Sequence, residues 1–140
     1  RGGMTPHRLV EPAGMPPAVG FSHAVAATRG RTVWIAGQIG ADPDGSVVGE
    51  SLVDQLDVAL GNVVTALRAA GAGPEHAVSM LLLTTAMDEY RRSRPALGLV
   101  YRRHFGRHFP AMALLGVTEL VDPAAKVEVV TTAVIPDPAG

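Results

Sequence analysis

The spacing of hydrophobic and polar positions changes several times along the chain, and this alternation predicts a mixed α+β fold. The segment from Arg31 to Gln38 is short and rich in β-branched and aromatic residues, which is typical of a strand. Residues His23 to Ala27 precede it across a turn signal at Thr28-Arg29-Gly30, so the two segments predict an opening β-hairpin. Asp42-Pro43-Asp44-Gly45 predicts a further reversal, because proline and glycine favour tight turns.

A helix is predicted after this turn, because apolar residues recur at helical spacing from Ser51 onward. Ser51 is a favourable N-cap residue, Asp54 follows three positions later, and Gly71 is a typical stop signal. One face of this helix is apolar and must be buried. Its stripe consists of Leu52, Leu56, Leu60, Val63 and Leu67.

The segment from Ala77 to Thr85 predicts a strand that is buried on both faces. Neighbouring elements must then cover both sides of it. Its alternating positions are Val78, Met80 and Leu82 on one side and Leu81 and Leu83 on the other.

A second helix is predicted from near Pro95 to about His104, because proline is tolerated in a first turn and Gly106 is a stop signal. Two final strands are predicted over Ala111 to Val117 and Lys126 to Ile135, joined by a turn at Asp122-Pro123. The predicted order of elements is therefore β-β-α-β-α-β-β.

Residues 4–140 contain no repeat, linker or low-complexity tract, so we expect a single domain. The chain has 140 residues and 47% hydrophobic content, which is enough to bury an ordinary globular core. Arg1-Gly2-Gly3 precedes Met4 and is interpreted as a remnant of an expression vector.

The predicted strands are apolar on both faces, although two helices can cover only one face of a sheet of this size. At roughly 25 cal/mol per Å2, exposing several such side chains would forgo a few kcal/mol and favour aggregation. We therefore expect a homo-oligomer whose subunits pack sheet to sheet. The opposed positions are Val33 and Ile35 against Trp34 and Ala36, and Ala113 and Leu115 against Met112 and Leu114.

Composition excludes several functional classes. The chain has no cysteine, which excludes disulfides, thiolate zinc sites and a cysteine nucleophile. A formal net charge of −1 gives no general attraction to nucleic acid. No apolar run approaches the roughly eighteen residues that span a bilayer, and no basic-then-apolar leader is present, so we expect a cytoplasmic protein without a membrane partner. The preference for arginine over lysine is typical of GC-rich bacterial genes.

Four short motifs occur in order along most of the chain. Between about Val19 and Val134 the sequence resembles the Rid family, also called YjgF or endoribonuclease L-PSP. This resemblance implies a trimer with the chorismate-mutase-like α+β fold, in which the sheets form a central barrel, the helices lie outside, and ligand clefts lie between subunits. The motifs are Gly20-Phe21-Ser22-His23-Ala24-Val25, Ala36-Gly37-Gln38-Ile39, Phe109-Pro110-Ala111-Met112-Ala113-Leu114 and Lys126-Val127-Glu128-Val129.

Met112 departs from the family pattern. Deaminating members of the family carry an arginine after Phe-Pro-Ala, where it binds the carboxylate of an imine or enamine acid. Methionine offers a flexible apolar thioether with no donor. Loss of one charge-assisted contact costs on the order of 1.5–3 kcal/mol. We therefore expect small imino acids such as 2-iminopropionate to be poor substrates, and a more apolar ligand to fit better.

Glu128 retains the other catalytic element of the family. By resemblance, a glutamate on the last strand positions the water that attacks the imine carbon. A carboxylate on an otherwise apolar strand also suggests a functional role without the family, because burial of an acid is unfavourable unless the acid is paired or hydrated. The alternative is that Glu128 only pairs with an arginine across a subunit interface.

Further residues are assigned to the cleft by the same resemblance. Phe21 and Ser22 are expected to line it, with Phe21 in place of a tyrosine. Gly37 indicates a bulge or a close approach of the backbone, and Asp88 falls where family members carry a polar residue. Each has a structural alternative, since Phe21 could belong to the core. A replacement for the missing cation could come from the loop that carries Arg91, Arg92 and Arg94.

Metal and triad chemistries are disfavoured. His104 and His108 are four residues apart, but Gly106 interrupts the helix between them and no carboxylate completes a ligand set, so neither a metal nor a cofactor is predicted. Ser22 and His23 are adjacent on a strand and would point to opposite faces, which excludes a triad with Asp88.

One basic cluster, six arginines between Arg91 and Arg107, could attract RNA, but aromatic stacking partners are few and a solvated helix face is preferred.

The leading hypothesis is a trimer whose intersubunit clefts hydrolyse an imine, an enamine or a related reactive metabolite. The alternative is a trimer that binds a ligand or has a regulatory role without catalysis, since a fold can be retained when its catalytic activity is lost.

Overall fold

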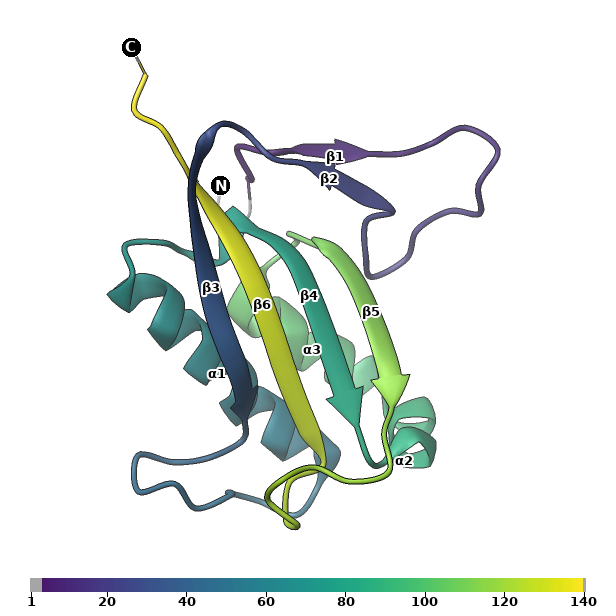
Figure 1. The fold of residues 1–140 in the computed structure, drawn as a ribbon. Coiled ribbons are helices and arrows are strands. Elements are labelled where there is room, and N and C mark those ends of the chain that lie inside the picture. The colour runs from purple at the N-terminus through teal and green to yellow at the C-terminus, as the bar shows by residue number, and fades with distance from the viewer. Residues whose placement is uncertain (1–3, 140) are drawn as a thin grey trace.

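The computed structural model describes residues 4–139, so the segment interpreted as a vector remnant lies outside the described residues. A four-stranded sheet with the order β3-β6-β4-β5 forms its centre (Figure 1). The strand β6 pairs antiparallel with both of its neighbours, while β4 and β5 are parallel. The strands are β3 (Gly30–Ile39), β4 (Ala77–Thr84), β5 (Ala111–Gly116) and β6 (Val127–Pro136).

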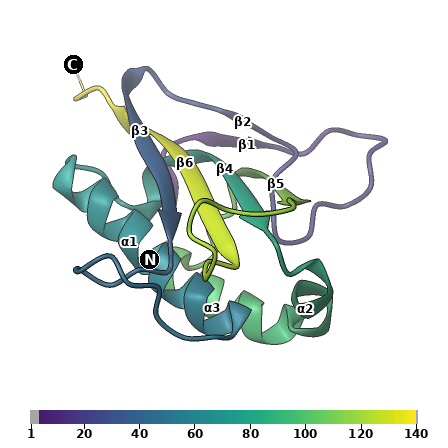
Figure 2. The same cartoon turned by 60° about the horizontal axis from the view of Figure 1, so that its bottom comes forward.

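Two helices cover one face of this sheet. Both views place α1 (Leu52–Ala69) and α3 (Arg94–Phe105) on the same side, and the short α2 (Met87–Arg92) lies at the end of β4 (Figure 1 and Figure 2). A 3-10 turn, η1 (Pro74–His76), leads into β4. The α+β class predicted from the sequence is confirmed.

The helix boundaries follow the signals in the sequence. The Ser51 side chain accepts a hydrogen bond of 3.0 Å from the backbone N–H of Asp54, which satisfies a free donor at the start of α1. Gly71 has a φ of 86° just after α1, and Gly106, with a φ of 60°, caps α3. The first helix was therefore predicted to within two residues. The sequence did not predict α2, whose six residues show no apolar periodicity.

The predicted opening hairpin is wrong. Strand β2 (Ala24–Ala26) pairs with β1 (Arg8–Val10) in a separate two-stranded ribbon, and β3 pairs with β6. The pairing of β3 with β6 is favoured because β6 is longer and more buried than β2. Strand β6 offers ten residues, half of them buried, to the ten residues of β3, whereas β2 offers only three. Local turn residues could not reveal a partner that lies about a hundred positions further along the chain.

The strand β4 is buried on one face only within the single chain. Met80, Leu82 and Thr84 face the helices, while Leu81 and Leu83 are half-buried on the other face. The register shows which side chains share this second face, because residues directly opposite on paired strands point the same way. Its members are Trp34, Thr132, Ser79, Val130, Leu81, Ala113, Glu128, Leu83 and Leu115, and we call it the open face.

The open face is apolar and uncovered in the single chain. Trp34 is 78% exposed and Leu115 is 47% exposed, whereas Ile35, the next residue along β3, is buried at 7%. Met112 and Leu114 pack against the core on the helix side. The expectation that both faces of the sheet are apolar is therefore correct.

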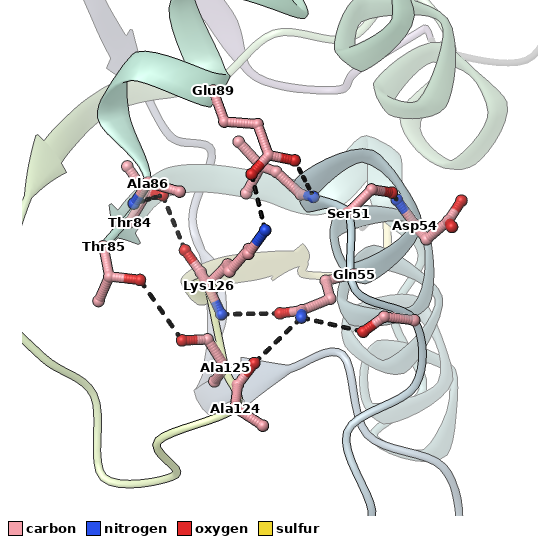
Figure 3. A network of polar contacts seen from close by, with 12 residues as sticks. Ser51, Asp54, Gln55, Thr84, Thr85, Ala86, Glu89, Ala124, Ala125 and Lys126 are labelled. Carbon is pink, nitrogen blue, oxygen red and sulfur yellow. Dashed lines mark hydrogen bonds and ion pairs between the residues drawn. The ribbon is translucent and has the colours of Figure 1, made fainter.

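A buried polar network joins α1, α2 and the segment before β6 (Figure 3). Gln55 is 1% exposed, and its amide donates to the carbonyls of Gly49 (3.2 Å) and Ala124 (3.1 Å) while accepting from the backbone N–H of Lys126 at 2.7 Å. Glu89 accepts from the Lys126 ammonium (2.8 Å) and from the backbone N–H of Leu52 (2.7 Å). The hydrogen bond from Lys126, followed by that from Leu52, lowers the pKa of Glu89.

Replacement of Gln55 by leucine should lower the free energy of unfolding by roughly 2–4 kcal/mol, because three hydrogen bonds to backbone groups are lost. Urea denaturation at fixed protein concentration measures this. The control is Arg68→Gln on the exposed side of the same helix, which should change the value by less than about 0.5 kcal/mol. Equal effects of the two substitutions would show that the network is not a stabilising element.

Candidate functional site

A cavity of about 910 Å3 opens at the edge of the sheet beside β5, between this strand, helix α3 and the segment that precedes β2. Phe21, Ser22 and Met112 all line it, so the structure brings together three of the residues assigned from the sequence. Met112 points to the helix side because it lies opposite Met80, a core residue. We call this cavity the edge pocket.

Ser22 joins the segment before β2, which forms one wall of the edge pocket, to the start of β5 by hydrogen bonds. Its backbone N–H donates to the carbonyl of Pro110 at 3.0 Å, its hydroxyl donates to the carbonyl of Phe109, and it forms a parallel bridge with Ala111. Ser22 is only 6% exposed. Its hydroxyl is thus engaged by the backbone, and its effect on the pocket is to hold Phe21 beside Met112.

Aromatic rings form the floor of the edge pocket. Tyr101 stacks on Phe109 with 5.1 Å between the ring centroids, and its hydroxyl donates to the carbonyl of His108 at 2.7 Å. Burial raises the pKa of Tyr101 well above its usual range, so the phenol stays neutral. This floor is formed by aromatic ring surfaces.

The basic cluster of the sequence is divided in the structure. Arg91 pairs with Asp88 at 3.3 Å and Arg103 pairs with Asp57 at 2.7 Å, both at the surface. Three other arginines, Arg94, Arg102 and Arg107, line the edge pocket. Of the loop arginines considered as a replacement cation, only Arg94 reaches this pocket.

Arg102 and Arg107 were not predicted as site residues from the sequence. A signal for Arg102 was present, since Arg94, Gly98 and Arg102 recur every four residues and therefore share one face of α3. That face was interpreted as solvated, and Arg94 and Arg102 are exposed. The sequence alone did not show that they also line a pocket with Phe21 and residues of β5.

Glu128 lies outside the edge pocket, on the open face of the sheet. Its carboxylate lies over the backbone of Gly37, where an added Cβ would collide with Oε2 of Glu128. The β3–β6 register shifts between Ile35 and Gln38, so Gly37 sits at a β-bulge, as its glycine suggested. Within residues 4–139 Glu128 forms no ion pair or side-chain hydrogen bond.

The assigned residues therefore form two groups in one chain. Phe21, Ser22 and Met112 line the edge pocket on the helix side of β5, while Gly37 and Glu128 lie together on the opposite face.

Asp88 lies apart from both groups. It sits in the first turn of α2, its side chain is 87% exposed, and it pairs with Arg91. Its assignment to the ligand site stays a prediction.

The histidines have separate local partners. His104 lies 2.6 Å from Asp57 at the surface, and the hydrogen bond from His104 is the main cause that lowers the pKa of Asp57. His108 is buried, with Nε2 at 2.7 Å from the carbonyl of Ala77, and burial lowers its pKa. Across residues 4–139 no group of three or more histidine, aspartate and glutamate side chains is placed to hold a metal ion. None of the helices in this range is long and apolar enough to cross a membrane.

Comparison with known proteins agrees with this architecture. The sequence profile of the Endoribonuclease L-PSP family matches residues 12–135. The chain belongs to the Rid family. It is 33% identical over 115 residues to the 2-iminobutanoate/2-iminopropanoate deaminase of Capra hircus, covering 81% of this chain and 80% of that protein. The Homo sapiens protein of the same name is 31% identical over the same shares.

Solved structures of Rid proteins share the fold. The Rid protein YyfB from Yersinia pestis, itself of unknown function, superposes with a TM-score of 0.83 at 32% identity, covering 92% of this chain and 98% of that one. The endoribonuclease-like protein TM0215 from Thermotoga maritima gives a TM-score of 0.68 at 30% identity, covering 93% and 98%. The recognition of the family from four short motifs is confirmed.

Proposed function

We propose that this Rid protein is a homotrimer that hydrolyses an imine or enamine in clefts between its subunits. Support comes from the family and from the deaminases named among its relatives. The observation that carries the proposal is the placement of Glu128, a half-buried carboxylate with no partner in the described chain, over the Gly37 backbone on the open face.

The open face supports assembly of several copies, and the family resemblance specifies three. Trp34, Leu81 and Leu115 give this surface an apolar character that water disfavours. The helices already occupy the other side of the sheet, so a second copy of the chain is the partner with a complementary surface. Three copies that turn these faces inward would form the central barrel that the family resemblance implies.

The location of the cleft follows from the separation of the two groups. The edge pocket opens beside β5, and Glu128 lies on the open face of the same sheet. When sheets pack against one another, the edge of one subunit approaches the open face of its neighbour. The Glu128 carboxylate of one subunit then completes the edge pocket of the next.

The chemistry needs one carboxylate and one water. The Glu128 carboxylate accepts a hydrogen bond from the water and takes its proton as the oxygen attacks the imine carbon. The proton passes to the nitrogen and gives a neutral tetrahedral adduct with one hydroxyl and one amino group. Glu128 then takes the hydroxyl proton and delivers it to the amino nitrogen, so that the carbonyl forms as the carbon–nitrogen bond breaks and ammonia leaves. An enamine first takes a proton at carbon and loses one from nitrogen to become the imine.

Glu128→Gln keeps the size of the side chain but removes its basicity. We expect the turnover rate to fall by about a hundredfold or more, because general-base catalysis raises a reaction rate by a factor of roughly 10²–10⁴. The turnover rate is measured as ammonia release from imines that an amino acid oxidase makes in situ. The variant is compared with the wild type on the imine that the wild type hydrolyses fastest. Glu50→Gln, at an exposed position, is the control and should leave the rate unchanged.

Met112 predicts that small imino acids are poor substrates. Met112→Arg should raise kcat/KM for 2-iminopropionate by roughly ten- to a hundredfold, the factor that one charge-assisted hydrogen bond supplies. Met112→Leu keeps an apolar side chain of similar volume and should give no gain. A wild type that already matches the arginine variant on this substrate would contradict the interpretation of position 112.

A second candidate function is a trimer that binds its ligand without converting it. Met112 favours this alternative, because it removes the contact with which deaminating members hold their substrates. Absence of hydrolysis across a panel of imines, together with measurable binding of a ligand, would establish it.

A further inference from the structure

We propose that the edge pocket binds a carboxylate with an apolar or aromatic body, and that arginines of helix α3 hold the carboxylate in place of the missing arginine at position 112. The location of the ligand rests on the proposed function. The binding itself is independent of whether any imine is hydrolysed.

The first support is charge. Arg94, Arg102 and Arg107 line the edge pocket, and within the described chain none of them forms an ion pair. Arg91 and Arg103, which lie outside it, are both paired with acids. Glu11 is the single acidic residue of the lining, so the pocket carries a net positive charge. Guanidinium groups stay protonated at any working pH.

The second support is the way in which two of these arginines are held. The guanidinium of Arg94 lies 5.6 Å from the centre of the Tyr90 ring, a cation–π contact. The Arg102 side chain lies over Gly98, where an added Cβ would come within 3.3 Å of its Nη1. Both side chains are exposed, and neither arrangement uses a hydrogen-bond donor of the guanidinium groups. Those donors remain available to an anion.

The third support is the apolar remainder of the pocket. The stacked rings of Tyr101 and Phe109 form the floor, and Leu97, Met112 and Leu114 add aliphatic and thioether surface. A cavity of about 910 Å3 is at the upper end of the range for drug-sized ligands and far larger than a three-carbon acid requires. Met112 thus contributes a contact surface for the body of the ligand.

Together these features imply a longer ligand than the 2-iminobutanoate and 2-iminopropanoate in the names of the relatives. A carboxylate held by Arg94 and Arg102 would be anchored on α3, whereas position 112 lies on β5. We therefore expect an apolar body between the carboxylate and the reacting carbon, which Glu128 of a neighbouring subunit would approach.

Calorimetric titration of the assembled protein with phenylacetate tests this proposal. Wild type should bind phenylacetate more tightly than acetate, which lacks the aromatic body, and more tightly than 2-phenylacetamide, which lacks the charge. Arg94→Gln combined with Arg102→Gln should weaken phenylacetate binding by roughly ten- to a hundredfold and leave 2-phenylacetamide binding unchanged. The matched control is Arg103→Gln on the same helix, which should bind phenylacetate as the wild type does.

Three results would overturn the proposal: no binding of phenylacetate by the wild type at millimolar concentration, an unchanged dissociation constant in the double variant, or an equal loss in Arg103→Gln. A folded double variant is verified by circular dichroism and by its unchanged affinity for 2-phenylacetamide. Failure of imine hydrolysis would leave these results intact, and failure of arginine-dependent binding would leave hydrolysis of neutral imines open. The two proposals therefore fail separately.

Discussion

The structure depends on one constraint, which is that its sheet is apolar on both faces while the chain supplies helices for only one. Helices α1 and α3 bury Ile35, Met80 and Val129 on their side. The other face presents Trp34 and Leu115 to solvent in the single chain. The position of the candidate site follows from this imbalance, because Glu128 belongs to the uncovered face and Met112 to the edge of the covered one.

Methionine in place of arginine at position 112 is compatible with the family fold but removes the carboxylate contact of the deaminating members. A methionine on the helix side of β5 packs against the core and leaves the sheet unchanged. The same side chain cannot hold a carboxylate, and we propose that Arg94 and Arg102 of α3 do so instead. The relatives named as deaminases share the family of this chain, and its ligand is a separate proposal.

Local signals in the sequence predicted what depends on local structure. The N-cap at Ser51, the helical spacing up to Leu67 and the final strands all appear in the structure near their predicted positions. The pairing of β3 could not be predicted from a turn signal, because its partner is the last strand. The motifs identified the family, but only the register showed that Glu128 and Met112 face opposite ways. The arginines of α3 are exposed, as the interpretation of a solvated face predicted, but charge alone did not show that Arg94 and Arg102 also line a pocket.

The central claim is that copies of this chain cover the open face and thereby complete the site. Sedimentation equilibrium at micromolar concentration tests it most directly, with Leu115→Glu on the open face compared with Leu99→Glu, an exposed leucine (61%) on α3. The wild type and Leu99→Glu should have about three times the chain mass of 14.5 kDa, while Leu115→Glu should dissociate. A monomeric wild type, or dissociation caused by Leu99→Glu and not by Leu115→Glu, would contradict the account.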